Sequence, residues 1–162
     1  MKLKRYGILL LALLLIALSV WGQATARRGL VVRSSESASI PMLYLAPENA
    51  KNIPGVLIAH GFAGSKQLML GYAHVLAHAG YAVMLWDFGG HAANRAPLNR
   101  FTLQKDLDIA TTALLEQPEV DATRLALLGH SMGSGAVMTA GISNIKRFAA
   151  TIAISPTGAA VT

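Results

Sequence analysis

Four short, mostly apolar runs follow one another between residues 56 and 154, and each is followed by a polar or glycine residue. They occupy residues 56–59, 81–86, 124–128 and 149–154. Continuous apolar runs of this length are typical of strands that are covered on both faces of a sheet. The pattern therefore predicts at least four buried strands.

The segments between these runs have the spacing of amphipathic helices. In residues 66–79 apolar side chains recur on one side, and Gly80 is well placed to end the helix. The same spacing predicts a helix over residues 102–117, with Thr102 as its cap and Pro118 beyond its end. Strands that alternate with helices predict βαβ units and a mainly parallel sheet.

Two further strands are predicted ahead of these units. Residues 30–33 and 40–45 are mostly apolar, and the polar residues 34–37 are expected to join them as a loop.

The N-terminal segment has a pattern of its own. Residues 6–26 contain no charged side chain and follow the basic residues Lys2, Lys4 and Arg5, as in a secretory signal. A small-x-small cleavage pattern ends at Ala26. An uncharged segment of this length can also span a bilayer, with Trp21 at the interface.

Residues 1–26 are therefore predicted to be a signal peptide or an N-terminal membrane anchor, and both alternatives stay open. The basic flank makes a buried helix of a soluble core the less favoured interpretation. Either of the first two alternatives places the remaining domain, residues 27–162, outside the cytoplasm, in a bacterial periplasm or at the cell surface.

Composition narrows the class of partner. The chain of 162 residues has a formal net charge of +6. Without residues 1–26, the 14 basic side chains fall by three to 11 against 8 acidic ones, a net charge of +3. The remaining basic residues are scattered and form no stripe with aromatic residues, so no nucleic-acid binding is predicted. The absence of cysteine excludes disulfides and thiolate metal sites.

Candidate chemistry is concentrated in one pentapeptide. Gly129-His130-Ser131-Met132-Gly133 lies between the apolar run 124–128 and a segment of small residues. A strand, a sharp turn carrying Gly-x-Ser-x-Gly, and a helix together form a nucleophile elbow. A Cβ atom at either glycine is expected to collide with the neighbouring backbone. Ser131 is therefore the candidate nucleophile.

The partners that such a serine needs do not follow it. A serine hydroxyl requires a base, and the base requires an orienting group. In the elbow architecture an Asp or Glu and then a His follow the serine in the chain. Between Ser131 and Thr162 there is no histidine, aspartate or glutamate. The chain is therefore expected to be the N-terminal part of an enzyme, and to be inactive and poorly soluble alone.

Three motifs together resemble the α/β-hydrolase superfamily over residues 30–156. His60-Gly61-Phe62 follows the third predicted strand, a segment from Asp87 to His91 follows the fourth, and the Ser131 pentapeptide follows the fifth. The chain is similar to serine esterases, lipases and dienelactone hydrolases.

The resemblance implies a three-layer α/β/α sandwich with a mostly parallel sheet, truncated after about strand six. The implied order of the strands in space is 1-2-4-3-5-6. Strand six, which is rich in Ala and Ile, then becomes an exposed edge.

The resemblance also implies roles for individual residues. Ser131 matches the nucleophile, and the backbone N–H groups of Phe62 and Met132 match the oxyanion hole that stabilises the tetrahedral intermediate. The implied function is hydrolysis of an ester, thioester or amide in a small acyl substrate through an acyl-enzyme. The alternative is a noncatalytic, membrane-associated binding protein that keeps a degenerate hydrolase fold.

The histidines have simpler interpretations than catalysis. His130 and His60 are expected to be structural, and His91 to help form the pocket. His74 and His78 lie four residues apart on a predicted helix, but a third metal ligand is missing, so a solvated surface is favoured.

No cofactor or metal is predicted. The glycines near residue 61 lack the spacing of a phosphate-binding loop, and those near residue 133 lack the spacing of a dinucleotide fingerprint.

Overall fold

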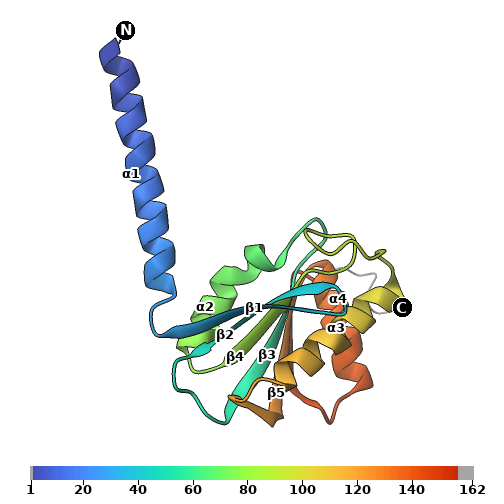
Figure 1. Ribbon diagram of the computed structural model, residues 1–162. Helices are drawn as coiled ribbons and strands as arrows, with labels where there is room; N and C mark the ends of the chain where they lie inside the picture. The colour runs from blue at the N-terminus through green and yellow to red at the C-terminus, as the bar shows by residue number, and fades with distance from the viewer. Residues whose placement is uncertain (1, 157–162) are drawn as a thin grey trace.

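Helix α1 (Lys2–Ala26) stands apart from the rest of the molecule in the computed structural model, which describes residues 2–156 (Figure 1). Its segment Tyr6–Ala26 has a mean hydropathy of 2.2, and none of it is buried. This is long and apolar enough to cross a membrane, a property that fits a membrane anchor and that signal sequences can share. Residues 157–162, which end the predicted domain, lie outside the described residues.

A six-stranded sheet forms the centre of the domain. Its strands are β1 (Leu30–Ser37), β2 (Ile40–Pro47), β3 (Ile53–Ala59), β4 (Ala82–Trp86), β5 (Val120–His130) and β6 (Phe148–Ile154). They lie in the order β1-β2-β4-β3-β5-β6, which confirms the expected order. β2 pairs antiparallel with β1 and β4, and the other pairs are parallel.

Helices cover both faces of this sheet. The short 3-10 helix η1 (Lys66–Met69) and α2 (Leu70–His78) pack on one face, against Val56, Ile58 and neighbours. α3 (Arg100–Leu115) and α4 (Met132–Ser143) pack on the other, where Leu57 and Met84 contribute to the core. Because successive strand residues point to opposite faces, the continuous apolar runs supply both cores at once.

The first hairpin is longer than predicted. Residues 34–37 continue β1 instead of forming a loop, and only Ala38 and Ser39 turn the chain. Both turn residues have positive φ angles, 48° and 64°, as a tight two-residue hairpin turn requires. The prediction was wrong because residues 34–37 are exposed on an edge strand, where polar side chains are compatible with pairing.

Helix α3 begins two residues earlier than predicted, and its cap is Asn99 instead of Thr102. The Asn99 side chain accepts hydrogen bonds from the N–H groups of Phe101 and Thr102, at 2.9 and 3.0 Å. The Thr102 hydroxyl accepts a bond from the Asn99 N–H at 2.9 Å, which completes a capping box.

Replacing Asn99 with alanine is expected to lower the free energy of unfolding by about 1 kcal/mol, because two helix N–H groups lose their acceptor. Urea unfolding of the full chain in a mild non-ionic detergent measures the change. Asn99→Asp keeps the acceptor oxygen and serves as the control, so equal losses in both variants would contradict the capping role.

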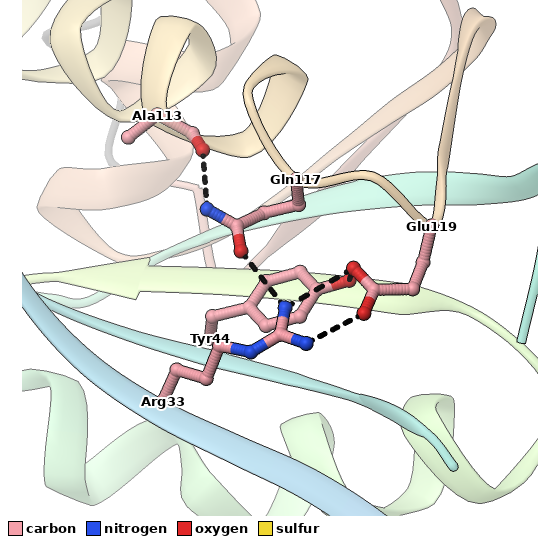
Figure 2. A network of polar contacts seen from close by, with 5 residues as sticks. All are labelled: Arg33, Tyr44, Ala113, Gln117 and Glu119. Carbon is pink, nitrogen blue, oxygen red and sulfur yellow. Dashed lines mark hydrogen bonds and ion pairs between the residues drawn. The ribbon is translucent and has the colours of Figure 1, made fainter. Parts of the chain in front are cut away.

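A polar network fastens the edge strand β1 to the loop that precedes β5 (Figure 2). The Arg33 guanidinium donates to both carboxylate oxygens of Glu119, at 2.7 and 3.1 Å, and to Gln117 at 3.1 Å. It also lies over the Tyr44 ring, whose hydroxyl donates to Glu119. The Arg33 hydrogen bonds lower the pKa of Glu119. Gln117 and Glu119 precede the N-terminal end of β5, whereas Ser131 follows its C-terminal end. The network therefore stabilises the end of the sheet that is remote from Ser131.

Within residues 2–156, β6 forms the other edge of the sheet, at the position expected of strand six. Residues 149–152 are exposed along it, and the Ile152 side chain is 50% exposed. The poor solubility expected from such an edge stays a prediction.

Candidate active site

Ser131 occupies the turn between β5 and α4. Its backbone angles are φ 52° and ψ −116°, far from the ordinary helix and strand regions. The turn is held from two sides, because the Ser131 N–H donates to Ile154 O on β6 and the Ser131 carbonyl accepts bonds from the Ser134 N–H and hydroxyl. Within the described chain, the Ser131 hydroxyl itself has no hydrogen-bond partner.

Both glycines of the pentapeptide lie where a side chain does not fit. A Cβ atom on Gly129 would lie 2.3 Å from Gly133 O, and one on Gly133 would lie 2.5 Å from the carbonyl oxygens of Ala59 and His60. These neighbours are backbone atoms, so larger residues require the strand or the helix to shift. The collision expected from the sequence is thus present at both positions.

The loop after β3 lies directly against the turn. A Cβ atom on Gly61 would lie 3.2 Å from the Ser131 Cβ. Phe62 follows Gly61 and has a side chain that is 71% exposed. Among residues 2–156, neither the Phe62 N–H nor the Met132 N–H donates to another group. Within the described residues both candidate N–H groups are therefore without an acceptor, and the loop that carries Phe62 lies against the Ser131 turn.

His60 holds this loop to the next one, as its structural interpretation expects. The ring is fully buried, its Nδ1 lies 2.8 Å from Gly61 O, and its Nε2 accepts a bond from the Phe88 N–H at 3.0 Å. With Nε2 accepting, the proton lies on Nδ1, which donates to Gly61 O. Burial lowers the pKa of His60, so the ring stays neutral.

The buried His60 ring is expected to make the folded protein less stable as the pH is lowered. The folded-state pKa lies below the ordinary value near 6.5, so the unfolded chain binds a proton that the folded chain does not. Nothing is lost well above pH 6.5. As the pH falls below 6.5, stability falls by up to about 1.4 kcal/mol per pH unit, until the lowered pKa of the folded state is reached.

Denaturant unfolding across the range from about pH 7.5 to about pH 5.5 tests this expectation. His60→Gln keeps an acceptor for the Phe88 N–H, removes the titrating ring, and leaves the other four histidines in place. The variant should show the shallower pH dependence, and equal slopes would contradict the assignment.

A buried ion pair fixes the far end of the same loop. Asp87 is fully buried at the end of β4 and accepts two hydrogen bonds from Lys66, one from its N–H at 2.8 Å and one from its ammonium group at 2.5 Å. Only 11% of the Lys66 side chain is exposed. Asp87 therefore positions the β3–η1 loop.

The loop after β4 depends on two residues that the sequence did not indicate. Asn94 donates to the Asp87 carbonyl at 2.8 Å, and Asp106 on α3 accepts from the Gly89 N–H at 2.8 Å. Both side chains are buried. Burial raises the pKa of Asp106. In the sequence, Asn94 is only one of several polar residues in a loop, and Asp106 is a single charged residue on the apolar side of a predicted helix.

His91 packs beside the candidate oxyanion loop. Its ring is edge-on to those of Phe62 and His60, with centroid distances of 5.4 and 5.3 Å. Its Nδ1 donates to Gly89 O at 2.9 Å. His91 thus helps to shape the surroundings of Phe62, and its part in a substrate pocket stays a prediction.

No metal site is found in the described part of the chain. Residues 2–156 contain no group of three His, Asp or Glu side chains arranged to hold an ion. His78, half of the possible pair, instead donates its Nε2 proton to Ala26 O at 3.0 Å.

An esterase is among the proteins that are similar in sequence to this chain. Esterase YjfP of Escherichia coli is 35% identical over 117 residues, which cover 64% of this chain and 46% of the esterase. An uncharacterized protein of Mycobacterium tuberculosis is 28% identical over 131 residues, covering 81% of this chain and 46% of that protein. The chain spans about half the length of the curated relatives it matches.

Solved structures share the fold at low sequence identity. A dienelactone hydrolase-like promiscuous phosphotriesterase from metagenomic libraries has a TM-score of 0.69 and 19% identity, over 79% of this chain and 60% of that one. Esterase Est22 has a TM-score of 0.68 and 18% identity, over 80% and 45% of the two chains.

A family model supplies the assignment. The model of the serine aminopeptidase S33 family matches residues 50–160, which include the loop after β3, the loop after β4 and the whole Ser131 turn. The chain therefore belongs to the serine aminopeptidase S33 family, within the α/β-hydrolase superfamily.

Proposed function

We propose that this protein is a serine hydrolase that cleaves an ester, thioester or amide of a small acyl substrate, with Ser131 as the nucleophile. The observation that carries the proposal is the backbone of Ser131, whose φ of 52° and ψ of −116° present an unpartnered hydroxyl above the end of β5. Strained backbone of this kind persists only where its surroundings enforce it, and it clusters at reactive sites.

The chemistry follows from the groups around this hydroxyl. The Ser131 Oγ attacks the acyl carbon while a base removes its proton, and the carbonyl oxygen becomes negative. The N–H groups of Phe62 and Met132 then bind that oxygen, a contribution of about 3 kcal/mol for each donor. When the intermediate collapses, the leaving alcohol, thiol or amine takes the proton, and water later releases the acyl group from Ser131.

The base and its orienting acid are proposed to lie beyond Thr162, so that residues 1–162 are the N-terminal part of the enzyme. His60 has both ring nitrogens in hydrogen bonds, and Asp87 is paired with Lys66. The length of the relatives and the esterase among them support this proposal. The enzyme is proposed to be exported or membrane-anchored through residues 1–26.

A fluorophosphonate probe tests the proposal, because it labels a serine that a base activates. The protein encoded by the whole open reading frame, which is proposed to continue beyond Thr162, is expected to be labelled on Ser131, as identified by peptide mass spectrometry. Residues 1–162 alone are expected to remain unlabelled. A longer product with an acid and a histidine that leaves Ser131 unlabelled would refute the hydrolase and favour the noncatalytic binding protein. Labelling of residues 1–162 would refute only the placement of the base.

A further inference from the structure

The outer side of η1 and α2 is apolar where a surface helix is ordinarily charged. Leu68 and Val75 are 72% and 70% exposed, and Tyr72 between them is 43% exposed. Their spacing of four and three residues places them on one side of the helix. No Asp, Glu, Lys or Arg occurs anywhere in residues 67–86. α3, on the opposite face of the sheet, carries Lys105 and Asp108 on its exposed side.

This apolar side lies next to the C-terminal end, or foot, of α1 at Ala26. The His78 ring at the end of α2 donates to the carbonyl of Ala26, the last residue of α1. Thr25 and Ala26 are partly buried there, whereas the rest of the Tyr6–Ala26 segment is not. The distance between the end of α1 and the end of α2 is thus fixed by a direct contact.

Figure 1 shows the direction in which α1 leaves the domain. α1 points upward in that view, and the loop between β3 and η1 lies at the top of the domain. η1 and α2 run from that loop back to the foot of α1. η1 and the end of the sheet that carries Ser131 therefore lie on the side of the domain toward which α1 extends.

The length of α1 fixes where that layer ends. The 21 residues of Tyr6–Ala26 rise about 32 Å as a helix, close to the thickness of about 30 Å of a bilayer's hydrocarbon core. Spanning that core places Ala26 at the boundary with the headgroups. Arg27 and Arg28 follow at once and are both exposed, and such residues are attracted to anionic headgroups.

We propose that the outer side of η1–α2, formed by Leu68, Tyr72 and Val75, rests on the lipid surface of the bilayer that α1 spans. The docked domain turns the Ser131 end of its sheet toward the membrane. The proposal rests on the anchor alternative for residues 1–26 and does not require Ser131 to be reactive.

The absence of cysteine allows a direct test on the full chain in vesicles of phosphatidylcholine and phosphatidylglycerol. Single variants Leu68→Cys, Tyr72→Cys and Val75→Cys carry an environment-sensitive fluorophore, and Asp108→Cys on α3 is the matched exposed control. We expect a lipid-bound quencher to quench the three α2-side probes several-fold more strongly than the control. Equal quenching at all four positions would overturn the proposal.

Two further arms separate docking from mere proximity. With Leu68→Glu and Val75→Glu combined, the probe at position 72 is expected to lose its lipid quenching, whereas a probe at Leu13→Cys in α1 keeps it. Retained quenching at position 72 overturns docking, and absent quenching at position 13 overturns the anchor. Protection of the α2-side probes from both lipid and aqueous quenchers, reversed on dilution, would assign this surface to a second copy of the chain instead.

Discussion

Replacing Ser131 with alanine or with glycine is expected to abolish fluorophosphonate labelling and ester hydrolysis. Only the glycine variant is expected to be more stable than the unsubstituted protein. Removing such a nucleophile lowers kcat by about 10⁶-fold, because no other group forms the acyl-enzyme. Alanine keeps a Cβ atom, and with it the strain at φ 52° and ψ −116°. Glycine relieves strain worth about 1–3 kcal/mol and loses about 0.5–1 kcal/mol in backbone entropy.

The two consequences are measured on different samples. Hydrolysis of a short-chain ester and probe labelling are followed in the protein encoded by the whole open reading frame. Unfolding free energy is measured on residues 1–162 in detergent, where Ser131→Gly is expected to gain about 1 kcal/mol. Ser143→Ala, at the exposed end of the same helix, is the control for both. A glycine variant that is less stable than alanine would show that the turn is not strained.

The parts of the fold that the sequence predicted are those in which local pattern and burial agree. β3 and β4 are apolar throughout because helices cover both sides of them, so a continuous run is sufficient to locate them. Gly80 ends α2 as predicted, with a φ of 96° that suits glycine. The order of the strands was implied by the family resemblance, not by periodicity.

Two elements differ from the sequence prediction, the end of β1 and the start of α3. In both, contacts of exposed residues decide where the element begins or ends. Residues 34–37 are polar because β1 is an edge strand, and pairing with β2 requires nothing of their side chains. Asn99 and Thr102 are both good cap residues, and only the position of the following turn selects Asn99.

The sharp turn that carries Ser131 could be predicted from the sequence, whereas the contacts that support this turn could not. Ser131 is recognisable because its glycines and its flanking strand are adjacent in sequence. The Lys66–Asp87 pair joins residues 21 positions apart, and no local pattern links one to the other. Pairings of this kind appear only once β3 and β4 are placed side by side.

Replacing Lys66 with methionine is expected to lower the free energy of unfolding by about 3 kcal/mol, among the largest single losses in the domain. Asp87 is fully buried, and removing its partner leaves a charge without compensation in the interior. Asp87→Asn should cost less, because the amide still accepts from the Lys66 N–H and the lysine ammonium lies close enough to the surface to reach water.

A double-mutant cycle isolates the contribution of the pair. Lys66→Met combined with Asp87→Asn is expected to be more stable than Lys66→Met alone, with a coupling of about 2 kcal/mol in denaturant unfolding. Lys105→Met, an exposed lysine on α3, is the matched control and should change stability by no more than about 0.5 kcal/mol. Additive effects in the cycle would mean that the two charges do not depend on one another.

The same pair is expected to matter for reactivity, because it fixes the loop that brings Phe62 beside Ser131. Lys66→Met should therefore reduce the rate of probe labelling in the longer product even where the protein remains folded, while the double variant recovers part of that rate. Labelling that is unchanged in a folded Lys66→Met variant would show that the glycine-rich contact between Gly61 and Ser131 is sufficient to hold the loop without the buried charges.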